Sequence, residues 1–562
     1  IFCPTAQAAI MAAQSSGTTW TTMVARENPD QLHWIAANDR EIDRLFLETT
    51  TPVFFRDVPH DRAVAYYNPV LKHKPTHPDP LKVFRVRGTF GNREKDYPGD
   101  TAAYTASLGD LKIILNRTVS TPGGKFMSMD ISDYYLGTPL KHAAYMMIAV
   151  KYLSEASMKK HDLAKYVHNG HVYVRLSRAL YGMPEAGYLA QQQLLPRLAA
   201  AGYTAAPQNP AIFKHDTSSV AFVLTVDDFG VSYVDQPHAE HLRDTLLKDY
   251  DITVDWTGTR YLGMNIYQQT HPTRSIAISM PEYLSKNLFI PFNLKKKSKR
   301  SVDSPLPFTP PKWGADQQLE ESPDESPPLS DADASIIRAQ IGVCLFYARC
   351  VDNTLECPLN KLSKRQSAPT QQFQELVDHF LQYLLWHPTT HIVFKPSDMQ
   401  LCIHSDASYL SEPMSRSRAA GFFWLGSDLP VNGPIDILTT TIKAVVSSAS
   451  EAEYGAAFLN ATHAIPLISA LNFLGHTQQP VPLTMDNQVA WGIAVGKVKL
   501  KKSKAMCMRF HWLKDREAQK QFKFLWDHGA SNLADYFTKT HPVAKYREMR
   551  PTYVTDKYDV TL

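Results

Sequence analysis

Two adjacent carboxylates, Asp227 and Asp228, lie in the stretch VLTVDDFGVSYV (residues 223–234), between short runs that are largely apolar and β-branched. Aspartate is a favoured turn residue, so a β-hairpin that simply turns here is one interpretation. Neighbouring negative charges also repel each other unless a cation neutralises them, and carboxylate oxygens are good ligands for hard divalent ions. The pair therefore indicates either an ordinary turn or part of a metal site.

A third carboxylate that could complete such a site lies upstream. In KFMSMDISDYYLGTPL (residues 125–140), an apolar-leaning strand ends at Asp130, and Asp133, Tyr134 and Tyr135 follow. Nucleotidyl transfer uses two divalent ions, one that activates the attacking hydroxyl and one that steadies the leaving pyrophosphate. One strand-end aspartate beside a hairpin that carries an aspartate pair would meet that requirement, if the two elements lie side by side.

A second set of acids occurs at predicted α/β junctions in the C-terminal part of the chain. The set comprises Asp406 at the end of LCIHSD, Glu451 in SSASEAEYGAAF, Asp486 in PLTMDNQ and Asp535 in SNLADYFTK. Strand ends and helix starts are where α/β folds gather ligands, so the four acids could converge. The alternative for Glu451 is structural, because Ser448 and Glu451 also fit a capping box.

Length and composition predict a globular chain of several domains. Its 562 residues exceed the size of a single core, and 44% hydrophobic and 11% aromatic residues exclude a largely disordered protein. The formal net charge of +4 does not by itself indicate a protein that binds nucleic acid. The basic runs KKKSKR (295–300) and KVKLKKSK (497–504) could meet phosphates or form ordinary solvated surface.

Cysteine spacing and the ends of the chain bear on its setting. The six cysteines form no C-x-x-C pair, which favours reduced residues in a cytosolic or nuclear protein. No apolar run approaches the roughly 18 residues that a membrane span needs. The chain opens IFCPTAQ, with no initiator Met and no signal peptide, which predicts a fragment of a longer product.

Two mixed α/β units joined by a helical connector must position these acids. The first unit begins with an amphipathic helix near residues 33–50, because apolar positions recur there at helical spacing. The predicted segments are a lead-in (1–32), the first α/β unit (33–290), a basic run with a Pro/Ser/acidic linker (291–335), a helical segment (336–397), the second α/β unit (398–541) and a tail (542–562).

Taken together, the motifs resemble the polymerase region of copia-type LTR retrotransposons. MDISDYYLGTPL, followed by VDD within a hydrophobic hairpin, resembles a reverse transcriptase palm, and LSRALYGMPEAG, RYLGMNI and IGVCLFYARCVD resemble the same family. The resemblance covers residues 33–552 and implies a multidomain α+β and α/β fold. It implies a right-hand polymerase with fingers and palm in 33–290 and a helical thumb or connection in 336–397, followed by an RNase H-like domain in 398–541.

The resemblance assigns roles to the first set of acids. It implies that Asp130 and Asp227 are the principal metal ligands and that Asp228 completes the catalytic triad. The family's Y-x-D-D box reads Thr225-Val226-Asp227-Asp228 here. The departure removes no ligand, but it changes the packing expected near the primer end.

Further residues are implied to bind the incoming nucleotide. Asp133 and Tyr134 would lie where backbone amides hold the triphosphate, and Tyr135 where an aromatic ring excludes a 2′-hydroxyl. The alternatives are a solvated strand-end acid for Asp133 and a core residue for Tyr135. Arg85 and Arg87 in KVFRVRGTFGN could contact the triphosphate, since guanidinium groups suit phosphate oxygens, or could simply be exposed on a strand.

The second set of acids resembles the Asp-Glu-Asp-Asp signature of the family's RNase H domain. The implied ligands are Asp406, Glu451, Asp486 and Asp535, with Glu453 as the runner-up to Glu451. They would hold two Mg²⁺ that align water for attack on the RNA of an RNA:DNA hybrid. SKAMCMRFHWLKDR (503–516) would touch the hybrid backbone, and His528 is not expected to be catalytic because it precedes Asp535 too closely.

The implied function is that of a reverse transcriptase, an RNA- and DNA-directed DNA polymerase, with ribonuclease H activity. The implied cofactor is Mg²⁺, two ions per site, with Mn²⁺ as an alternative. The implied partners are an RNA template, a DNA primer, RNA:DNA hybrid and dNTPs, with self-association and other Pol products as further candidates and no membrane. Cytoplasmic virus-like particles and delivery of DNA to the nucleus are implied. The alternatives are a decayed or domesticated nucleic-acid-binding relic and an RNase H-only enzyme.

Overall fold

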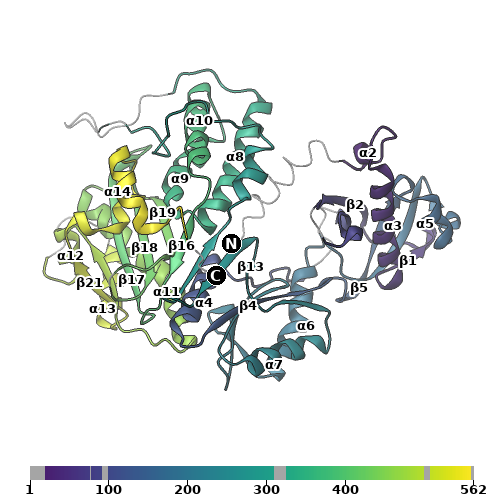
Figure 1. The fold of residues 1–562 in the computed structure, drawn as a ribbon, viewed down its shortest axis with the longest axis horizontal. Coiled ribbons are helices and arrows are strands. Elements are labelled where there is room, and N and C mark those ends of the chain that lie inside the picture. The colour runs from purple at the N-terminus through teal and green to yellow at the C-terminus, as the bar shows by residue number, and fades with distance from the viewer. Residues whose placement is uncertain are drawn as a thin grey trace.

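The computed structural model describes residues 19–75, 78–91, 99–308, 310, 324–428, 430–498 and 507–558. Within these ranges, four sheets and the helices that flank them make up a multidomain α+β chain, which confirms the predicted fold class (Figure 1). Parts of the predicted segments lie outside the described residues: 1–18 of the lead-in, 76–77 and 92–98 of the first unit, 309 and 311–323 of the linker, 429 and 499–506 of the second unit, and 559–562 of the tail. These include 499–504 of the second basic run and 503–506 of SKAMCMRFHWLKDR.

The first sheet lies at one end of the molecule (Figure 1, right). Its strands have the order β1-β7-β5-β2-β3, with β6 paired to β7. Helix α3 (Gln31–Glu48) packs on β3 and matches the predicted amphipathic helix. The other elements are α2 (Trp20–Met23), β1 (Thr50–Val53), β2 (Val64–His73), β3 (Phe84–Gly91), β5 (Pro139–Ala149), α5 (Glu155–Lys160), β6 (Val167–His168) and β7 (His171–Arg178).

The second sheet carries the first set of acids and has helices on both faces. Its order is β12-β4-β11-β10-β9-β8. Phe126 and Val223 pack on the α4 side, whereas Met127 and Leu224 pack with α6 and α7 on the other side, as alternation along strands requires. The elements are α4 (Leu108–Ser120), β4 (Lys125–Ile131), α6 (Ala186–Ala200), β8 (Tyr203–Ala206), β9 (Asn209–His215), β10 (Ala221–Thr225), β11 (Asp228–Tyr233), α7 (Gln236–Leu247) and β12 (Ile252–Asp255).

The third sheet joins the first α/β unit to the helical connector. Strand β16 (His391–Phe394) pairs with β15 (Ser275–Ser279) although more than 100 residues separate them along the chain. The segment 336–397, predicted to be helical, contains most of α8 and all of α9 and α10. The elements are β13 (Arg260–Tyr261), β14 (Met264–Gln269), α8 (Asp331–Cys350), α9 (Glu356–Arg365) and α10 (Gln371–Trp386).

The fourth sheet carries the second set of acids, with the order β19-β18-β17-β20-β21. Strands β17, β18 and β19 are antiparallel neighbours, whereas β20 and β21 run parallel to β17. Helix α11 packs across β17 and β18. The elements are β17 (Leu401–Glu412), β18 (Arg416–Leu425), β19 (Pro434–Ile442), α11 (Ala449–Phe473), β20 (Val481–Met485), α12 (Gln488–Ala494), α13 (Cys507–Ala518), β21 (Phe522–Trp526) and α14 (Val543–Tyr553).

Two features of this last unit were not expected from the sequence. By length and composition alone, α11 could span a membrane, but it lies across the fourth sheet and nearly half of its apolar window is buried. The segment predicted as a tail contains α14, whose Tyr546 and Tyr553 are buried against Tyr536. The hydroxyl of Tyr553 also donates to the carbonyl oxygen of Leu533 at 2.8 Å. Helix α14, which begins beyond residue 541, is therefore packed into this unit.

Candidate active sites

The strand register of the second sheet brings the first three acids together. Asp130 on β4 lies directly opposite Asp228 on β11. Thr225 pairs with Asp228 across the β10–β11 hairpin, which leaves Val226 and Asp227 as a two-residue turn. The backbone N–H of Ile131 donates to the carbonyl oxygen of Asp227 at 3.0 Å. The predicted turn and the predicted acid cluster are therefore the same feature.

Carboxylate oxygens of Asp130, Asp227 and Asp228 all lie within 4.8 Å of one another. Burial and the neighbouring carboxylates raise the pKa of Asp227 to about 6 and that of Asp228 to about 7. Burial also raises the pKa of Asp130, against the opposing charges of Arg85 and Arg87. Close carboxylates with raised pKa values favour the binding of a positive charge among them.

The hairpin turn is held in a strained conformation. Val226 has a φ of 62°, in the left-handed region that β-branched residues rarely adopt. The hydroxyl of Tyr261 on β13 donates to the carbonyl oxygen of Asp228 at 3.1 Å and lies 3.4 Å from the hydroxyl of Thr225. A Cβ on Gly230 would lie 3.1 Å from the Tyr261 ring, so glycine lets the ring approach β11. Tyr261, which belongs to the segment RYLGMNI, thus clamps the β10–β11 hairpin through its hydrogen bond to Asp228.

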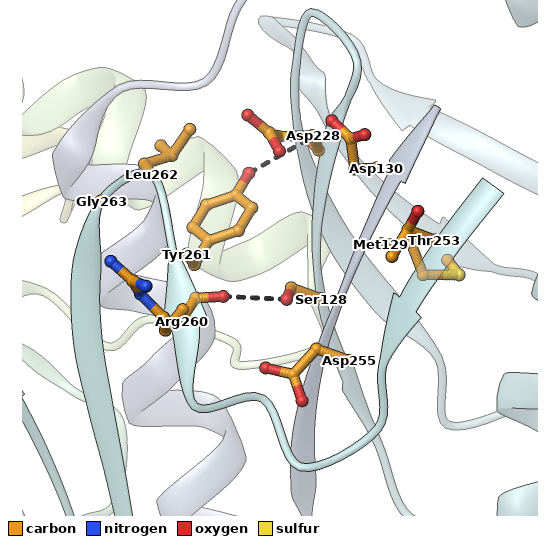
Figure 2. Close-up of a pocket in the computed structure, with 10 residues that line it drawn as sticks. All are labelled: Ser128, Met129, Asp130, Asp228, Thr253, Asp255, Arg260, Tyr261, Leu262 and Gly263. Atoms are coloured by element: carbon orange, nitrogen blue, oxygen red, sulfur yellow. Dashed lines mark hydrogen bonds between the residues drawn. The ribbon is translucent and has the colours of Figure 1, made fainter. Parts of the chain in front are cut away.

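A cavity of about 230 Å³ opens beside two of these acids. Figure 2 shows Asp130 and Asp228 at one end of it and Asp255 at the other, with the Tyr261 hydroxyl directed toward Asp228. The hydroxyl of Ser128 donates to the carbonyl oxygen of Arg260 at 2.9 Å, which ties β4 to β13 along the wall. The sequence offered no signal for this cavity, because its walls come from strands far apart in the chain.

The side chains of Asp133 and Tyr134 have partners outside the cluster of three acids. Asp133 pairs with Arg44 of α3, which also pairs with Glu41 at 2.5 Å. The Tyr134 side chain is 4% exposed and packs in the core near Tyr250. A contact between the Tyr134 ring and a substrate is therefore excluded by burial, and only its backbone amide remains a candidate for substrate binding.

Tyr135 lies at the edge of the acid cluster. It is half-buried, and its ring centroid is 5.3 Å from that of Tyr181. Burial, together with the charge of Asp227, raises the pKa of Tyr135 to about 12. A Cβ on Gly187 would lie 3.6 Å from its hydroxyl oxygen, and the Arg87 guanidinium stacks on Tyr181 at 4.3 Å. Tyr135 is thus neither fully core nor free in solvent.

Arg85 and Arg87 belong to a group of cations on the first sheet. Lys72 on β2 lies opposite Arg85 on β3. Burial and the charges of Lys72, Arg85 and Arg87 lower the pKa of Lys74. Since both arginines also act on Asp130, this cationic face is directed toward the acids. Lys72 and Lys74 were missed by the sequence analysis, because the cross-strand register that groups them with the arginines is not local.

The second set of acids converges on the fourth sheet. His404 on β17 pairs with Thr484 on β20 in parallel register, so Asp406 and Asp486, each two residues further on, lie side by side. Asp486 directly follows β20, but Asp406 lies within β17, which continues to Glu412, so the prediction that Asp406 ends a strand was wrong. Oxygens of Asp406, Glu453 and Asp486 lie within 4.8 Å of one another. Burial, then the charges of Asp535 and Asp486, raise the pKa of Asp406 to about 7, and burial raises that of Glu453 well above its usual value.

The acid that α11 brings to this cluster is Glu453, the runner-up in the sequence analysis, and the cluster does not include Glu451. One Glu451 carboxylate oxygen accepts from the backbone N–H of Ser447 at 2.8 Å, and its own N–H donates to the Ser448 hydroxyl at 3.2 Å. Glu451 therefore caps the helix. Residues two apart project about 200° from each other around a helix, so only one of the two glutamates faces Asp406.

Only one of the two carboxylate oxygens of Glu453 has a hydrogen-bond partner among the described residues. Its Oε1 accepts from the backbone N–H of Ala407 at 3.2 Å, whereas its buried Oε2 has no hydrogen-bond partner among the described residues. A buried carboxylate oxygen without a partner is costly unless a cation or donor satisfies it. Three buried or half-buried carboxylates with one such oxygen fit a hard divalent ion.

Asp535 and His528 lie at the margin of this centre. Asp535 is not among the three clustered acids; it pairs with Lys539 and, at 2.5 Å, with Lys545. Burial raises the pKa of Asp535, but the two lysines outweigh burial and the net shift is downward. The Thr538 hydroxyl donates to Asp406 at 2.8 Å. Thr538 and Lys539 were missed, although both stand in the quoted motif NLADYFTK.

The exposed loop after β21 approaches Asp486. The Trp526 indole N–H donates to the carbonyl oxygen of Asp486 at 2.9 Å, and the His528 ring lies 4.9 Å from that of Trp526. A Cβ on Gly529 would lie 2.9 Å from an Asp486 carboxylate oxygen, so glycine permits this approach. In the described part of 503–516, Arg509 and Arg516 stack on aromatic rings of the same unit.

No family model matches the chain. It is 24% identical over 425 residues to the retrovirus-related Pol polyprotein from transposon TNT 1-94 of Nicotiana tabacum, a match that covers 74% of this chain and 30% of the polyprotein. A foamy viral protease-reverse transcriptase in complex with dsDNA aligns with a TM-score of 0.46 and 15% identity, covering 88% of this chain and 82% of that chain. The same viral protein in complex with RNA/DNA hybrid gives a TM-score of 0.44 and 14% identity, covering 93% and 55%.

Both TM-scores are below 0.5, so no argument rests on these two likenesses. The chain spans 30% of the length of its retrotransposon relative, so the activities of that whole polyprotein do not transfer to it directly. The predicted resemblance to a retrotransposon Pol polyprotein is confirmed by this relative.

Proposed function

We propose that the chain is the reverse transcriptase and ribonuclease H region of a copia-type retrotransposon Pol polyprotein. The observation that carries the proposal is the register that sets Asp130 opposite Asp228 with Asp227 in the adjoining turn. The second acid cluster, around Asp406 and Glu453, supports a separate hydrolytic centre on the same chain. Similarity to a transposon Pol polyprotein over 74% of the chain supports the assignment to that class.

Divalent cations fit both centres. All donors are carboxylate oxygens, which Mg²⁺ prefers and Mn²⁺ accepts. Burial and then the neighbouring carboxylates raise the pKa values of Asp227, Asp228 and Asp406, and a cation bound among them would offset this effect. Asp130, Asp227 and Asp228 would hold two ions in the first centre. Such ions, when bound, supply Lewis acids for the nucleophile and the leaving group.

The residues around the first centre suit a primer, a template and a dNTP. Arg85 and Arg87 offer planar guanidinium groups to the triphosphate, from a sheet whose positive charge acts on Asp130. Tyr135, beside Asp227, would contact the sugar and exclude a 2′-hydroxyl. The cavity next to Asp228 would receive the end of the primer, with Tyr261 holding its wall.

The second centre suits hydrolysis of the RNA strand of an RNA:DNA hybrid. Asp406, Glu453 and Asp486 would hold the ions, and Asp535 would support them from the edge. The two activities are complementary, because copying RNA produces the hybrid that the second centre would degrade. We place the fingers and palm in 33–290, the thumb or connection in 336–397 and the ribonuclease unit from 398 onward, including α14, and propose action in cytoplasmic particles with delivery of DNA to the nucleus.

The proposal is tested by giving the purified chain a DNA primer annealed to an end-labelled RNA template, with dNTPs and Mg²⁺. We expect template-length DNA together with shortened RNA fragments, and loss of both when EDTA removes the ions. Omission of dNTPs should abolish DNA synthesis but leave cleavage of preformed hybrid. A folded chain that binds the hybrid and produces neither product would contradict the proposal and favour a nucleic-acid-binding relic.

A further inference from the structure

One lysine, Lys539, pairs with Asp535, and its charge also acts on the other three acids of the second centre. Lys539 follows Asp535 by four residues, and its ammonium pairs with the Asp535 Oδ1 oxygen. Its positive charge also opposes the effect of burial on Asp406, Glu453 and Asp486. Half of its side chain is exposed, at 50% of the accessible maximum. Lys539 is therefore both part of the centre and accessible to a ligand from solvent.

A second lysine makes Lys539 unnecessary for neutralising Asp535. Lys545, from the first turn of α14, donates to the other Asp535 oxygen, Oδ2, at 2.5 Å. The two ammonium groups thus share one carboxylate, whose single negative charge one of them would balance. Both lysines pair with Asp535, but only the charge of Lys539 is also among those that act on Asp406, Glu453 and Asp486. We therefore take the charge of Lys539 as the one in excess.

The charge of the occupied centre points to an anion as the ligand. Four acids and two lysines carry a net charge of −2, and the two divalent ions of the proposed function would change this to +2. Because the ions would then neutralise the carboxylates, the half-exposed ammonium of Lys539 would favour a negatively charged ligand. Lysine binds phosphate as a point charge, and a nucleic-acid backbone presents one negative charge at each phosphodiester.

We propose that Lys539 binds a phosphodiester of the nucleic acid at the ribonuclease centre, beside Asp406, Glu453 and Asp486, while Lys545 holds Asp535 in place. The ligand is a non-bridging phosphate oxygen, and the inference rests on the proposed hydrolysis of RNA:DNA hybrid. Lys539 leaves Asp535 for the phosphate, and Asp535 keeps its bond to Lys545. This exchange explains why one aspartate carries two lysines.

The test compares Lys539→Met with Lys545→Met, which removes the other lysine from the same carboxylate. Affinity of the full chain for a fluorescein-labelled RNA:DNA hybrid is measured with Ca²⁺ over a range of salt concentrations. Loss of one phosphate contact should reduce the slope of log affinity against log salt by about 1 in Lys539→Met and leave it unchanged in Lys545→Met. Lys539→Arg should keep the parent slope, because it keeps the charge.

Single-turnover cleavage of the same hybrid with Mg²⁺ gives the second readout. We expect Lys539→Met to need about tenfold more hybrid for half-maximal cleavage, as expected from the loss of one charged contact. Thermal unfolding establishes that each variant is folded, and Lys539→Gln is the second neutral variant if Lys539→Met is not.

Equal salt slopes for the parent and the folded neutral variant, Lys539→Met or Lys539→Gln, with a parent that cleaves hybrid, would overturn the inference and leave the proposed function intact. A parent that binds hybrid without cleaving it would count against the proposed function. In that case the salt slopes would still decide whether Lys539 contacts phosphate.

Discussion

Glu453 and Asp406 bring carboxylate oxygens to within 4.8 Å of each other from a helix and a strand that lie 47 positions apart in the sequence. Glu451, one helical half-turn away, instead bonds to Ser447 and caps the helix. We therefore expect Glu453→Gln to lower hybrid cleavage by on the order of a thousandfold. Glu451→Gln should retain cleavage and lose only about 1 kcal/mol of unfolding free energy. The reverse pattern of cleavage rates would return Glu451 to the centre.

The clamp between Tyr261 and the catalytic hairpin predicts a selective polymerase defect. Tyr261→Phe removes the bond to the carbonyl oxygen of Asp228 that helps to hold Val226 at positive φ. We expect slower dNTP incorporation, by about tenfold, as expected for one lost hydrogen bond, with hybrid cleavage unchanged. Tyr267→Phe, on the neighbouring strand β14, is the matched control. Equal incorporation rates in the parent and both variants would show that the hairpin does not need the clamp.

The placement of Tyr135 predicts a change in sugar discrimination. Tyr135→Val opens the space between Asp227 and Gly187, where the ring now lies. We expect the ratio of rNTP to dNTP incorporation to rise at least about tenfold, since a steric exclusion is removed. Tyr181→Phe, which alters the ring that Tyr135 packs against, should leave that ratio unchanged. An unchanged ratio in Tyr135→Val would make Tyr135 a packing residue.

A half-buried polar junction between the second and fourth sheets predicts a pH-dependent stability. His463 Nε2 lies 2.8 Å from Asp436 Oδ2, and Lys112 of α4 and Glu356 of α9 face the same pair. Burial lowers the pKa of His463, but the bond to Asp436 and the charge of Glu356 outweigh it, so the net shift is upward. The bond then stabilises fully below the unfolded value of about 6.5 and is lost as pH rises through the folded pKa.

We therefore expect the unfolding midpoint of the parent to fall between pH 6 and pH 8 more steeply than that of His463→Gln, at ionic strengths held equal. Asp436 contributes in the opposite direction, because its lowered pKa gives stability that is lost as pH falls below about 4. His238→Gln, at an exposed site on α7, controls for the general effect of removing a histidine. Identical pH profiles for the parent and His463→Gln would show that the His463–Asp436 bond contributes no pH-dependent stability.

The sequence was sufficient for the acids that follow strands. Asp130 lies near the end of β4, Asp227 lies in the turn that follows β10, and Asp486 directly follows β20, where a sheet places its last side chains together. Asp228 begins β11, and Asp406 lies within β17, which continues to Glu412. These positions depend on local pattern alone. Strand pairing, which only the structure shows, then brings these aspartates together in each of the two sheets.

Residues on helices and in tertiary contacts were harder to predict. Helix α11 is apolar on nearly all sides, so its sequence does not reveal whether Glu451 or Glu453 faces the sheet. Tyr261 contacts a hairpin more than 30 residues away, and α14 is buried only because Tyr536 receives its aromatic side chains. The Tyr261 contact joins residues more than 30 positions apart, so a short window of sequence does not contain both partners. Tyr536 and Tyr546 are ten positions apart, but their spacing does not show that the two rings meet.

The most direct measurement disables each centre separately on the full chain. Asp227→Asn with Asp228→Asn should lower dNTP incorporation on a primed RNA template by on the order of a thousandfold or more and leave cleavage of preformed hybrid intact. Asp406→Asn with Glu453→Gln should do the reverse. Two separate losses would establish two independent metal-dependent centres. Loss of both activities in either folded variant, or of neither, would contradict that assignment.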